Sequence, residues 1–203
     1  MIETIPVLVI LLFSVICHEY AHARVALWKG DTTARDLGRI TLNPLPHIDP
    51  FGTVLLPLML FLIHSPFLIG AAKPVPVNPS RFQNPKKDML LVSMAGPATN
   101  MILAICAGII ARIAVGLGLS DAIYYFLNWA VTINLVLAFF NLIPVPPLDG
   151  SEIIMYHLPD HLAEKYARIG RFGMIIIILL FILGPFRGLI GLFVYFFRGL
   201  ILG

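Results

Sequence analysis

The stretch VLVILLFSVICHEYAHARVAL, residues 7–27, is an apolar run that is interrupted by His18, Glu19 and His22. An apolar segment of this length is typical of a helix that crosses a membrane. On such a helix, residues four positions apart lie on the same face, one turn from each other. Ionisable side chains are costly inside a bilayer and mark a functional site by default, and a polar cluster that holds helices together is the alternative.

The whole chain has the composition of a multi-pass membrane protein. Of its 203 residues, 59% are hydrophobic and only 12% are charged, which is too few charges for the surface of a soluble domain. The formal net charge of +3 is too small to indicate a nucleic-acid partner. The two cysteines, Cys17 and Cys106, lie in apolar segments and indicate no disulfide framework. We therefore expect an all-α membrane protein whose main surroundings are the lipid bilayer.

Apolar segments alternate with polar, proline-rich stretches along the chain. We expect about five to six membrane segments in a single domain, residues 1–203, without internal repeats. The first segment lacks the positive amino-terminal region of a signal peptide, so we expect it to be retained as a span. The apolar segments are approximately 5–27, 51–72, 88–118, 121–144, 167–184 and 185–203.

Basic residues are concentrated in three stretches, 24–50, 73–88 and 145–172. Basic loops favour the cytoplasmic side of a membrane, so we expect all three on that side. Segment 51–72 then has both ends on one side, and two internal prolines break its helical continuity. We predict that this segment is re-entrant or interfacial; hydropathy alone favours the alternative, a simple membrane-crossing helix.

His18, Glu19 and His22 form an H-E-x-x-H pattern. Two imidazoles one helical turn apart can bind one Zn²⁺, beside a carboxylate that can take a proton from water. A site of this type needs a third protein ligand. Asp149, which follows three prolines and precedes Gly150, is the one further acidic residue that we expect at membrane depth. Its D-x-x-E pattern fits a helix N-cap equally well, and the two roles can coexist.

Topology and chemistry agree at this point. Asp149 can reach the two histidines only if segment 121–144 ends on the same side of the membrane as the first span. That holds only if segment 51–72 does not cross the membrane, which is what the distribution of basic residues also predicts.

Three motifs, in this order, resemble the signatures of the site-2 proteases. They are HEYAH at 18–22, MAGPATN at 94–100 and NLIPVPPLDG at 141–150. Members of this family are intramembrane zinc metalloproteases that cut transmembrane or membrane-proximal segments of their substrates. The resemblance extends from residue 5 to about 155. The sequence has neither the PDZ insertion nor the C-terminal CBS domain of better-known members, and is most similar to the short prokaryotic form.

The resemblance implies that His18, His22 and Asp149 bind one zinc ion per chain and that Glu19 is the general base. It also suggests that Asn141 positions the substrate carbonyl or stabilises the oxyanion.

Two further features are implied by the same resemblance. Asn100, together with Gly96 and Pro97, would pack helices together and support the metal-binding side chains. Residues 37–45 and 73–79 are the candidates for a small membrane-associated β patch, whose edge can receive an extended substrate.

The predicted function is zinc-dependent hydrolysis of a peptide bond within or next to a transmembrane segment of single-span membrane proteins. We expect the catalytic core at about 5–155, a C-terminal membrane hairpin at about 167–203, and the active site near the cytoplasmic side of the cell membrane. The sequence does not predict an oligomeric state, a natural substrate or a cleavage position.

Other functions fit parts of the sequence. A divalent-cation transporter also uses broken helices and buried carboxylates near the middle of the membrane, but the short chain lacks repeat symmetry. An inactive relative is disfavoured because His18, Glu19, His22 and Asp149 are all present. A di-iron hydroxylase would need more than the six histidines of this chain.

Overall fold

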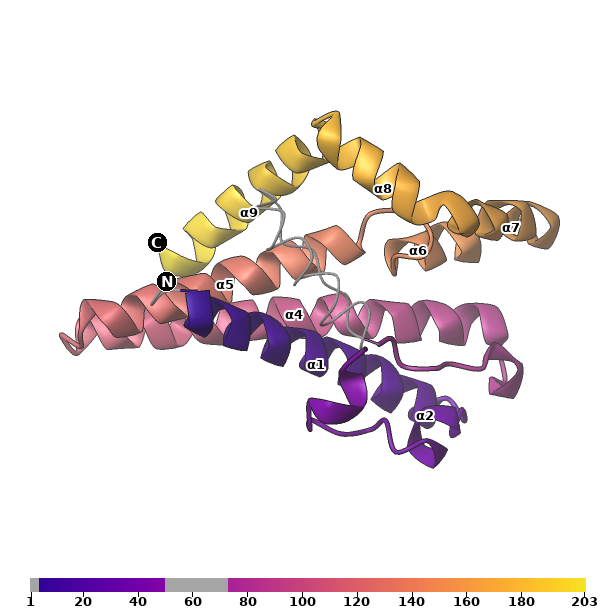
Figure 1. Cartoon of the computed structure of the whole chain (residues 1–203), viewed down its shortest axis with the longest axis horizontal. Coiled ribbons are helices and arrows are strands. Elements are labelled where there is room, and N and C mark those ends of the chain that lie inside the picture. Colours follow the sequence, from indigo (N-terminus) through magenta and orange to yellow (C-terminus); the bar gives the residue numbers. More distant parts are fainter. Residues whose placement is uncertain (1–3, 50–72) are drawn as a thin grey trace.

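The computed structural model describes residues 4–49 and 73–203, and three long helices dominate it (Figure 1). These helices are α1 (Thr4–Trp28), α4 (Pro85–Gly116) and α5 (Asp121–Asn141). Each is long and apolar enough to cross a membrane. They pack against one another, and α4 and α5 run antiparallel through a short turn at 117–120. The C-terminal ends of α1 and α5 and the start of α4 therefore lie towards the same end of the bundle.

Small residues allow the helices to approach closely. The buried face of α4 repeats Gly96, Asn100, Ala104, Gly108 and Ala111 at helical spacing. A Cβ at Gly108 would lie 2.0 Å from a side-chain carbon of Ile201, so the last helix of the chain touches α4 directly at this glycine. Small residues are how membrane helices gain contact area without a hydrophobic driving force between them.

The C-terminal part of the chain forms a bent pair of helices. The chain from Asp160 to Ile182 and the following helix α9 (Pro185–Leu202) are bent by 72° relative to each other. Gly184, at the bend, has φ of 93°, a conformation that glycine adopts without steric cost. The described residues thus contain three candidate spans, or four if the bent pair counts as one, so the predicted five to six are not confirmed. The re-entrant segment predicted at 51–72 lies outside the described residues.

The predicted β patch is not confirmed either. Residues 37–45 and 73–79, all of them described, form turns, a short 3-10 helix and extended chain, but no strand. The physical reason lies in where the N–H groups of the second segment go. Those of Lys73 and Val75 donate to the carbonyl of His47 and to Glu19, and the prolines at 74 and 76 have none, so residues 73–76 offer no free N–H group to a ladder.

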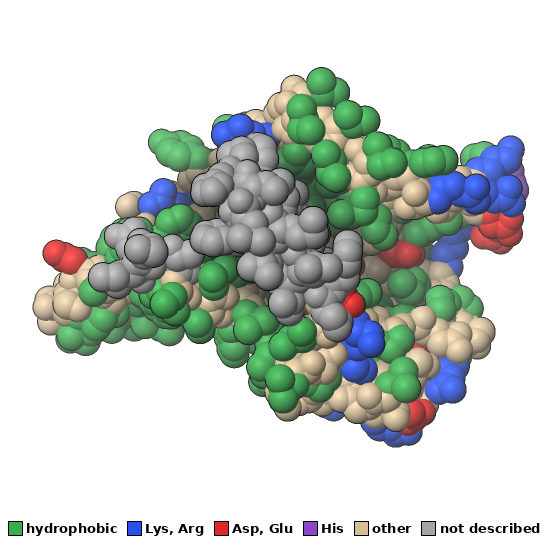
Figure 2. All heavy atoms as spheres, in the orientation of Figure 1, with side chains coloured by type: hydrophobic (Ala, Val, Ile, Leu, Met, Phe, Trp, Pro, Cys, Tyr) green, Lys and Arg blue, Asp and Glu red, His purple; other side chains and the backbone are tan. Residues whose placement is uncertain are grey.

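Shorter helices surround the basic end of the bundle. Figure 2 shows Lys and Arg side chains over α2 and α7, and further basic side chains near α9. The remaining elements are α2 (Thr33–Asp36), η1 (Leu45–His47), η3 (Pro79–Arg81), α6 (Gly150–His157), α7 (Asp160–Ala167), η4 (Arg168–Phe172) and α8 (Gly173–Ile182).

Candidate metal centre and catalytic site

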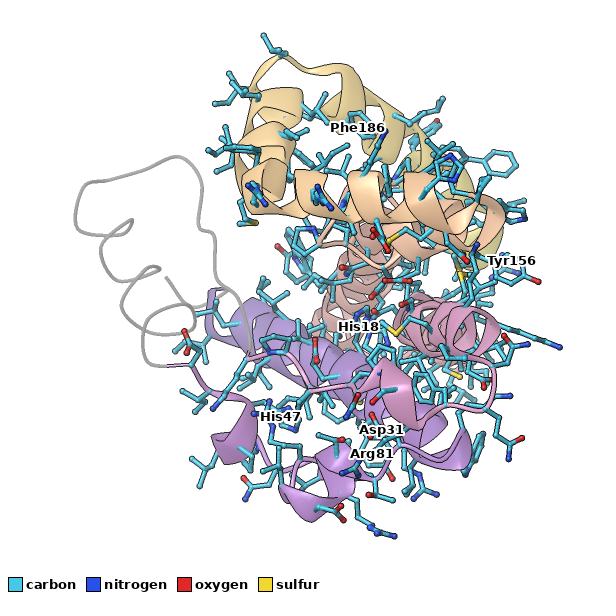
Figure 3. The ribbon with its side chains drawn as sticks, turned by 90° about the vertical axis from the view of Figure 1, so that its right-hand side faces the viewer. His18, Asp31, His47, Arg81, Tyr156 and Phe186 are labelled. Carbon is cyan, nitrogen blue, oxygen red and sulfur yellow. The ribbon has the colours of Figure 1, made fainter. Side chains whose placement is uncertain are left out.

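The two histidines of α1 and Asp149 meet inside the bundle. One oxygen of Asp149, Oδ2, lies 3.2 Å from Nε2 of His18 and 3.4 Å from Nε2 of His22. One ligand atom from each of the three residues lies within 4.8 Å of the other two. Both histidines are buried, and Figure 3 shows His18 among the helices rather than on the outside. The three side chains are therefore close enough to bind one ion.

The opposite nitrogens of the two imidazoles are engaged by α4. Nδ1 of His22 lies 2.7 Å from the carbonyl of Val92, and Nδ1 of His18 lies 2.6 Å from Oδ1 of Asn100. Because a carbonyl oxygen can only accept, Nδ1 of His22 carries a hydrogen. In the neutral ring, the lone pair of Nε2 then faces Asp149. This is the arrangement in which metal-binding histidines are normally held.

Gly96 on α4 provides room for the imidazole rings. A Cβ at this position would lie 2.4 Å from Nε2 of His22 and 2.5 Å from Nε2 of His18, so any side chain would displace the ligand atoms. The glycine of MAGPATN therefore has a direct role at the site, beyond helix packing.

Asp149 stands at the N-cap position of α6, but its side chain makes no capping hydrogen bond. Its Oδ2 is buried and, among the residues that the structure describes, has no hydrogen-bond partner. The capping role that the sequence allowed is thus not the one that this carboxylate performs. The following Gly150 is needed for a close approach, because a Cβ there would lie 2.2 Å from the carbonyl oxygen of Leu142 at the end of α5.

The proline-rich loop that carries Asp149 is held from the C-terminal part of the chain. The hydroxyl of Tyr166 donates to the carbonyl of Pro144 at 2.6 Å. Gly173, the first residue of α8, packs against the loop so closely that a Cβ would lie 1.8 Å from the carbonyl oxygen of Pro146. Residues beyond the predicted catalytic core therefore help to place the third member of the cluster.

This contact gives a stability prediction. Gly173→Ala is expected to cost about 1–3 kcal/mol because the loop must move away from the new methyl group. For a chain of this size that lowers the melting temperature of the purified protein by roughly 2–4 °C per kcal/mol. Gly188→Ala, in α9 with no atom within 4 Å of the new Cβ, is the matched control. Equal melting temperatures for the two variants would show that the loop is not tightly packed here.

Glu19 is oriented by a backbone group that lies far away in sequence. The N–H of Val75 donates to Oε2 of Glu19 at 2.7 Å. Val75 belongs to the extended segment 73–78, which runs beside α1 along the site. One carboxylate oxygen of Glu19 is thereby fixed, and the other remains able to receive a proton.

Asp31 anchors the other end of this extended segment. Its Oδ2 accepts from the N–H of Asn78 at 2.6 Å, and its Oδ1 accepts from the hydroxyl and N–H of Thr33. Burial acts to raise the pKa of Asp31, but these donors and the nearby Arg81 together hold the pKa below its usual range. Figure 3 shows Asp31 and Arg81 close together below the long helices. The carboxylate thus stays charged and keeps segment 73–78 against α1.

A cavity of about 240 Å³ contains most of the predicted site. It is lined by His18, Glu19, His22, Asn141 and Asp149, with one wall from segment 73–78 and another from Pro147. Asn141 donates from Nδ2 to the carbonyl of Leu137 at 3.0 Å, which fixes its amide at the cavity wall. Asn100 is fully buried behind His18 and does not line the cavity.

Two participants were missed by the sequence analysis. Asn134 on α5 is buried and hydrogen-bonds Asn100; its signal was available, because it is a polar residue inside an apolar helix. The contact between Val75 and Glu19 involves a backbone N–H, so it cannot be predicted from residue type.

One protein-family model, that of peptidase family M50, matches residues 112–182. This range contains Asp149 but begins well after the H-E-x-x-H pattern at 18–22.

Curated relatives match over most of the chain. A Bacillus subtilis protein named "Putative zinc metalloprotease YwhC" is 39% identical over 188 residues, which are 89% of this chain and 82% of that protein. A Mycolicibacterium smegmatis protein named "Putative zinc metalloprotease Rip2" is 29% identical over 182 residues, 84% of this chain and 64% of that protein. No solved structure matches the chain. On the strength of the family model and the first of these relatives, the chain belongs to peptidase family M50, the site-2 protease family that its three motifs resemble.

Proposed function

We propose that this protein is a zinc-dependent intramembrane endopeptidase, in which His18, His22 and Asp149 hold the metal and Glu19 is the general base. The observation that carries the proposal is the meeting of these three ligand atoms beside a cavity that Glu19 also lines. Nitrogen and carboxylate donors are the set that zinc takes at hydrolytic sites with three protein ligands.

The residues fit a bound cation. A carboxylate oxygen buried without a hydrogen bond, next to two imidazole nitrogens whose lone pairs face it, is costly unless a positive charge compensates it. The absence of a side chain at Gly96 leaves space at these nitrogens. When bound, zinc would supply Lewis acidity towards water and towards the peptide carbonyl.

The chain's own groups account for the proton transfers. Glu19 takes a proton from the attacking water and later gives it to the leaving amine. The N–H of Val75 keeps Oε2 of Glu19 in place, so that Oε1 carries the proton. Asn141, whose amide is fixed at the cavity wall, offers a donor to the substrate carbonyl as negative charge develops on its oxygen.

The substrate must be extended at the scissile bond, because a helix would shield the carbonyl. Single-span membrane proteins are the substrates that we propose, since the site lies on membrane-length helices.

The loops at the same end of the bundle as the site are basic, so this end faces the cytoplasm under the positive-inside rule. We place the whole chain in one membrane domain, with a core at about 5–155 and the bent helix pair at about 167–203 supporting it.

Purified protein in detergent tests the proposal. We expect one zinc per chain, cleavage of some members of a panel of single-span membrane peptides, loss of cleavage on chelation and recovery when zinc is added back. A fully folded protein that binds no zinc would overturn the metal site. Metal flux into sealed vesicles without any proteolysis would instead favour the divalent-cation transporter, which membership of a peptidase family disfavours.

A further inference from the structure

Three buried polar residues form one hydrogen-bonded cluster with His18, and the cluster extends across three helices. Ser14 and His18 lie one turn apart on α1, Asn100 lies on α4 and Asn134 on α5. Ser14 and Asn100 have no exposed surface, and Asn134 is 3% exposed. Polar groups this deep in a membrane bundle must find their hydrogen-bond partners among one another. The donor and the acceptor of each bond can therefore be assigned in turn, from one residue to the next.

The assignment of donors and acceptors begins at the backbone carbonyl of Ala130. This oxygen can only accept, and it lies 2.9 Å from Nδ2 of Asn134, which also donates to Oγ of Ser14 at 2.9 Å. The amide nitrogen of Asn134 is therefore used, and its Oδ1 faces Asn100. Nδ2 of Asn100 donates to this oxygen at 2.9 Å, and also lies 3.4 Å from the backbone carbonyl of Ser14.

The same reasoning extends to the metal site. Because the amide nitrogen of Asn100 faces Asn134, its Oδ1 faces His18 and can only accept from Nδ1 at 2.6 Å. In the neutral His18 ring the hydrogen is thus held on Nδ1, and the lone pair of Nε2 faces Asp149. His22 reaches the same state directly through the carbonyl of Val92. The tautomer of His22 is fixed by a backbone carbonyl, and that of His18 by two side-chain amides.

We propose that Asn134 is a positioning residue of the metal centre: it fixes the orientation of the Asn100 amide and, through it, the tautomer of His18. The inference rests on the proposed zinc-binding function. Without an acceptor at position 134, the Asn100 amide can turn over and donate to Nδ1 of His18. The ring hydrogen then moves to Nε2, and this nitrogen no longer has a free lone pair to bind the metal.

Zinc affinity, measured by competition with a chelator, tests this role together with the melting temperature of the metal-free protein. Asn134→Leu, which is similar in size, is expected to weaken zinc binding about 10–100-fold, as loss of an outer partner of a metal ligand does. Asn128→Leu is the matched control: Asn128 lies on the same helix and accepts from Arg198, away from the site. Its zinc affinity is expected to stay at the wild-type value.

A double variant separates positioning from general loosening. If Asn134 acts through Asn100, Asn134→Leu adds nothing to the loss already caused by Asn100→Leu. Additive losses, or wild-type affinity in a folded Asn134→Leu variant, would overturn the inference and leave the proposed function intact. A wild type that binds no zinc would overturn both.

A spectroscopic measurement on the wild type does not depend on any Asn134 variant folding. In metal-free protein labelled with ¹⁵N-histidine, at alkaline pH where the rings are neutral, His18 is expected to carry its hydrogen on Nδ1. Its signals are assigned by their loss in His18→Gln. A hydrogen on Nε2 would contradict the proposed chain of hydrogen bonds.

Discussion

Glu19→Gln is expected to lower the rate of peptide cleavage about 10²–10⁴-fold, the usual contribution of a general base. Glutamine has nearly the same shape and can still accept the hydrogen bond from the N–H of Val75. It cannot take a proton from water. Zinc content and melting temperature should therefore remain close to those of the wild type, so that the loss falls on catalysis alone.

The measurement compares cleavage rates of one single-span peptide at matched zinc loading. Glu164→Gln, which makes the same chemical change at an exposed position on α7, is the control and should cleave at the wild-type rate. Cleavage by Glu19→Gln at the rate of this control would remove Glu19 from the mechanism, whatever the metal content proved to be.

Asp149→Asn is expected to have a comparably large effect on cleavage, because it weakens zinc binding. The substitution keeps the shape of the side chain but removes the charge that faces the two imidazoles. Loss of an outer partner of a metal ligand costs about 10–100-fold in affinity, and loss of a ligand should exceed this. Cleavage should fail for want of metal, while the metal-free protein remains folded.

Zinc titration followed by thermal unfolding provides the readout. A ligand at 100 times its dissociation constant stabilises a protein by about 2.7 kcal/mol, so zinc should raise the melting temperature of the wild type but not that of Asp149→Asn. Asp121→Asn, an exposed aspartate at the opposite end of α5, should respond like the wild type. A zinc-dependent rise in Asp149→Asn equal to that of the wild type would exclude Asp149 as a ligand.

Much of the candidate site could be predicted because its signals are local. The H-E-x-x-H spacing places both imidazoles on one helix face, and few other acids lie at membrane depth. Whether Asp149 is a cap or a ligand could not be decided from D-x-x-E, since both roles begin with the same residue. In the structure its carboxylate caps nothing and faces the histidines.

The β patch was predicted from the resemblance and is the clearest disagreement. Segment 73–78 is extended, as its prolines predict, but extension is only half of a strand. Its N–H groups at 73, 75 and 78 are taken by the carbonyl of His47 and by the carboxylates of Glu19 and Asp31. The segment orients the carboxylate of Glu19, the proposed general base, where a sheet edge had been expected.

From its sequence alone, this chain could be recognised as a membrane protein with a metal-binding helix, because hydropathy and helical spacing are properties of neighbouring residues. Only the tertiary structure shows that Asn134 stands behind His18, that Val75 holds Glu19, and that Gly173 supports the loop of Asp149. These contacts join residues far apart in the chain through an amide orientation, a backbone N–H and a missing Cβ. The partner in each of these contacts does not follow from residue type or spacing, since it depends on which surfaces the packed helices bring together.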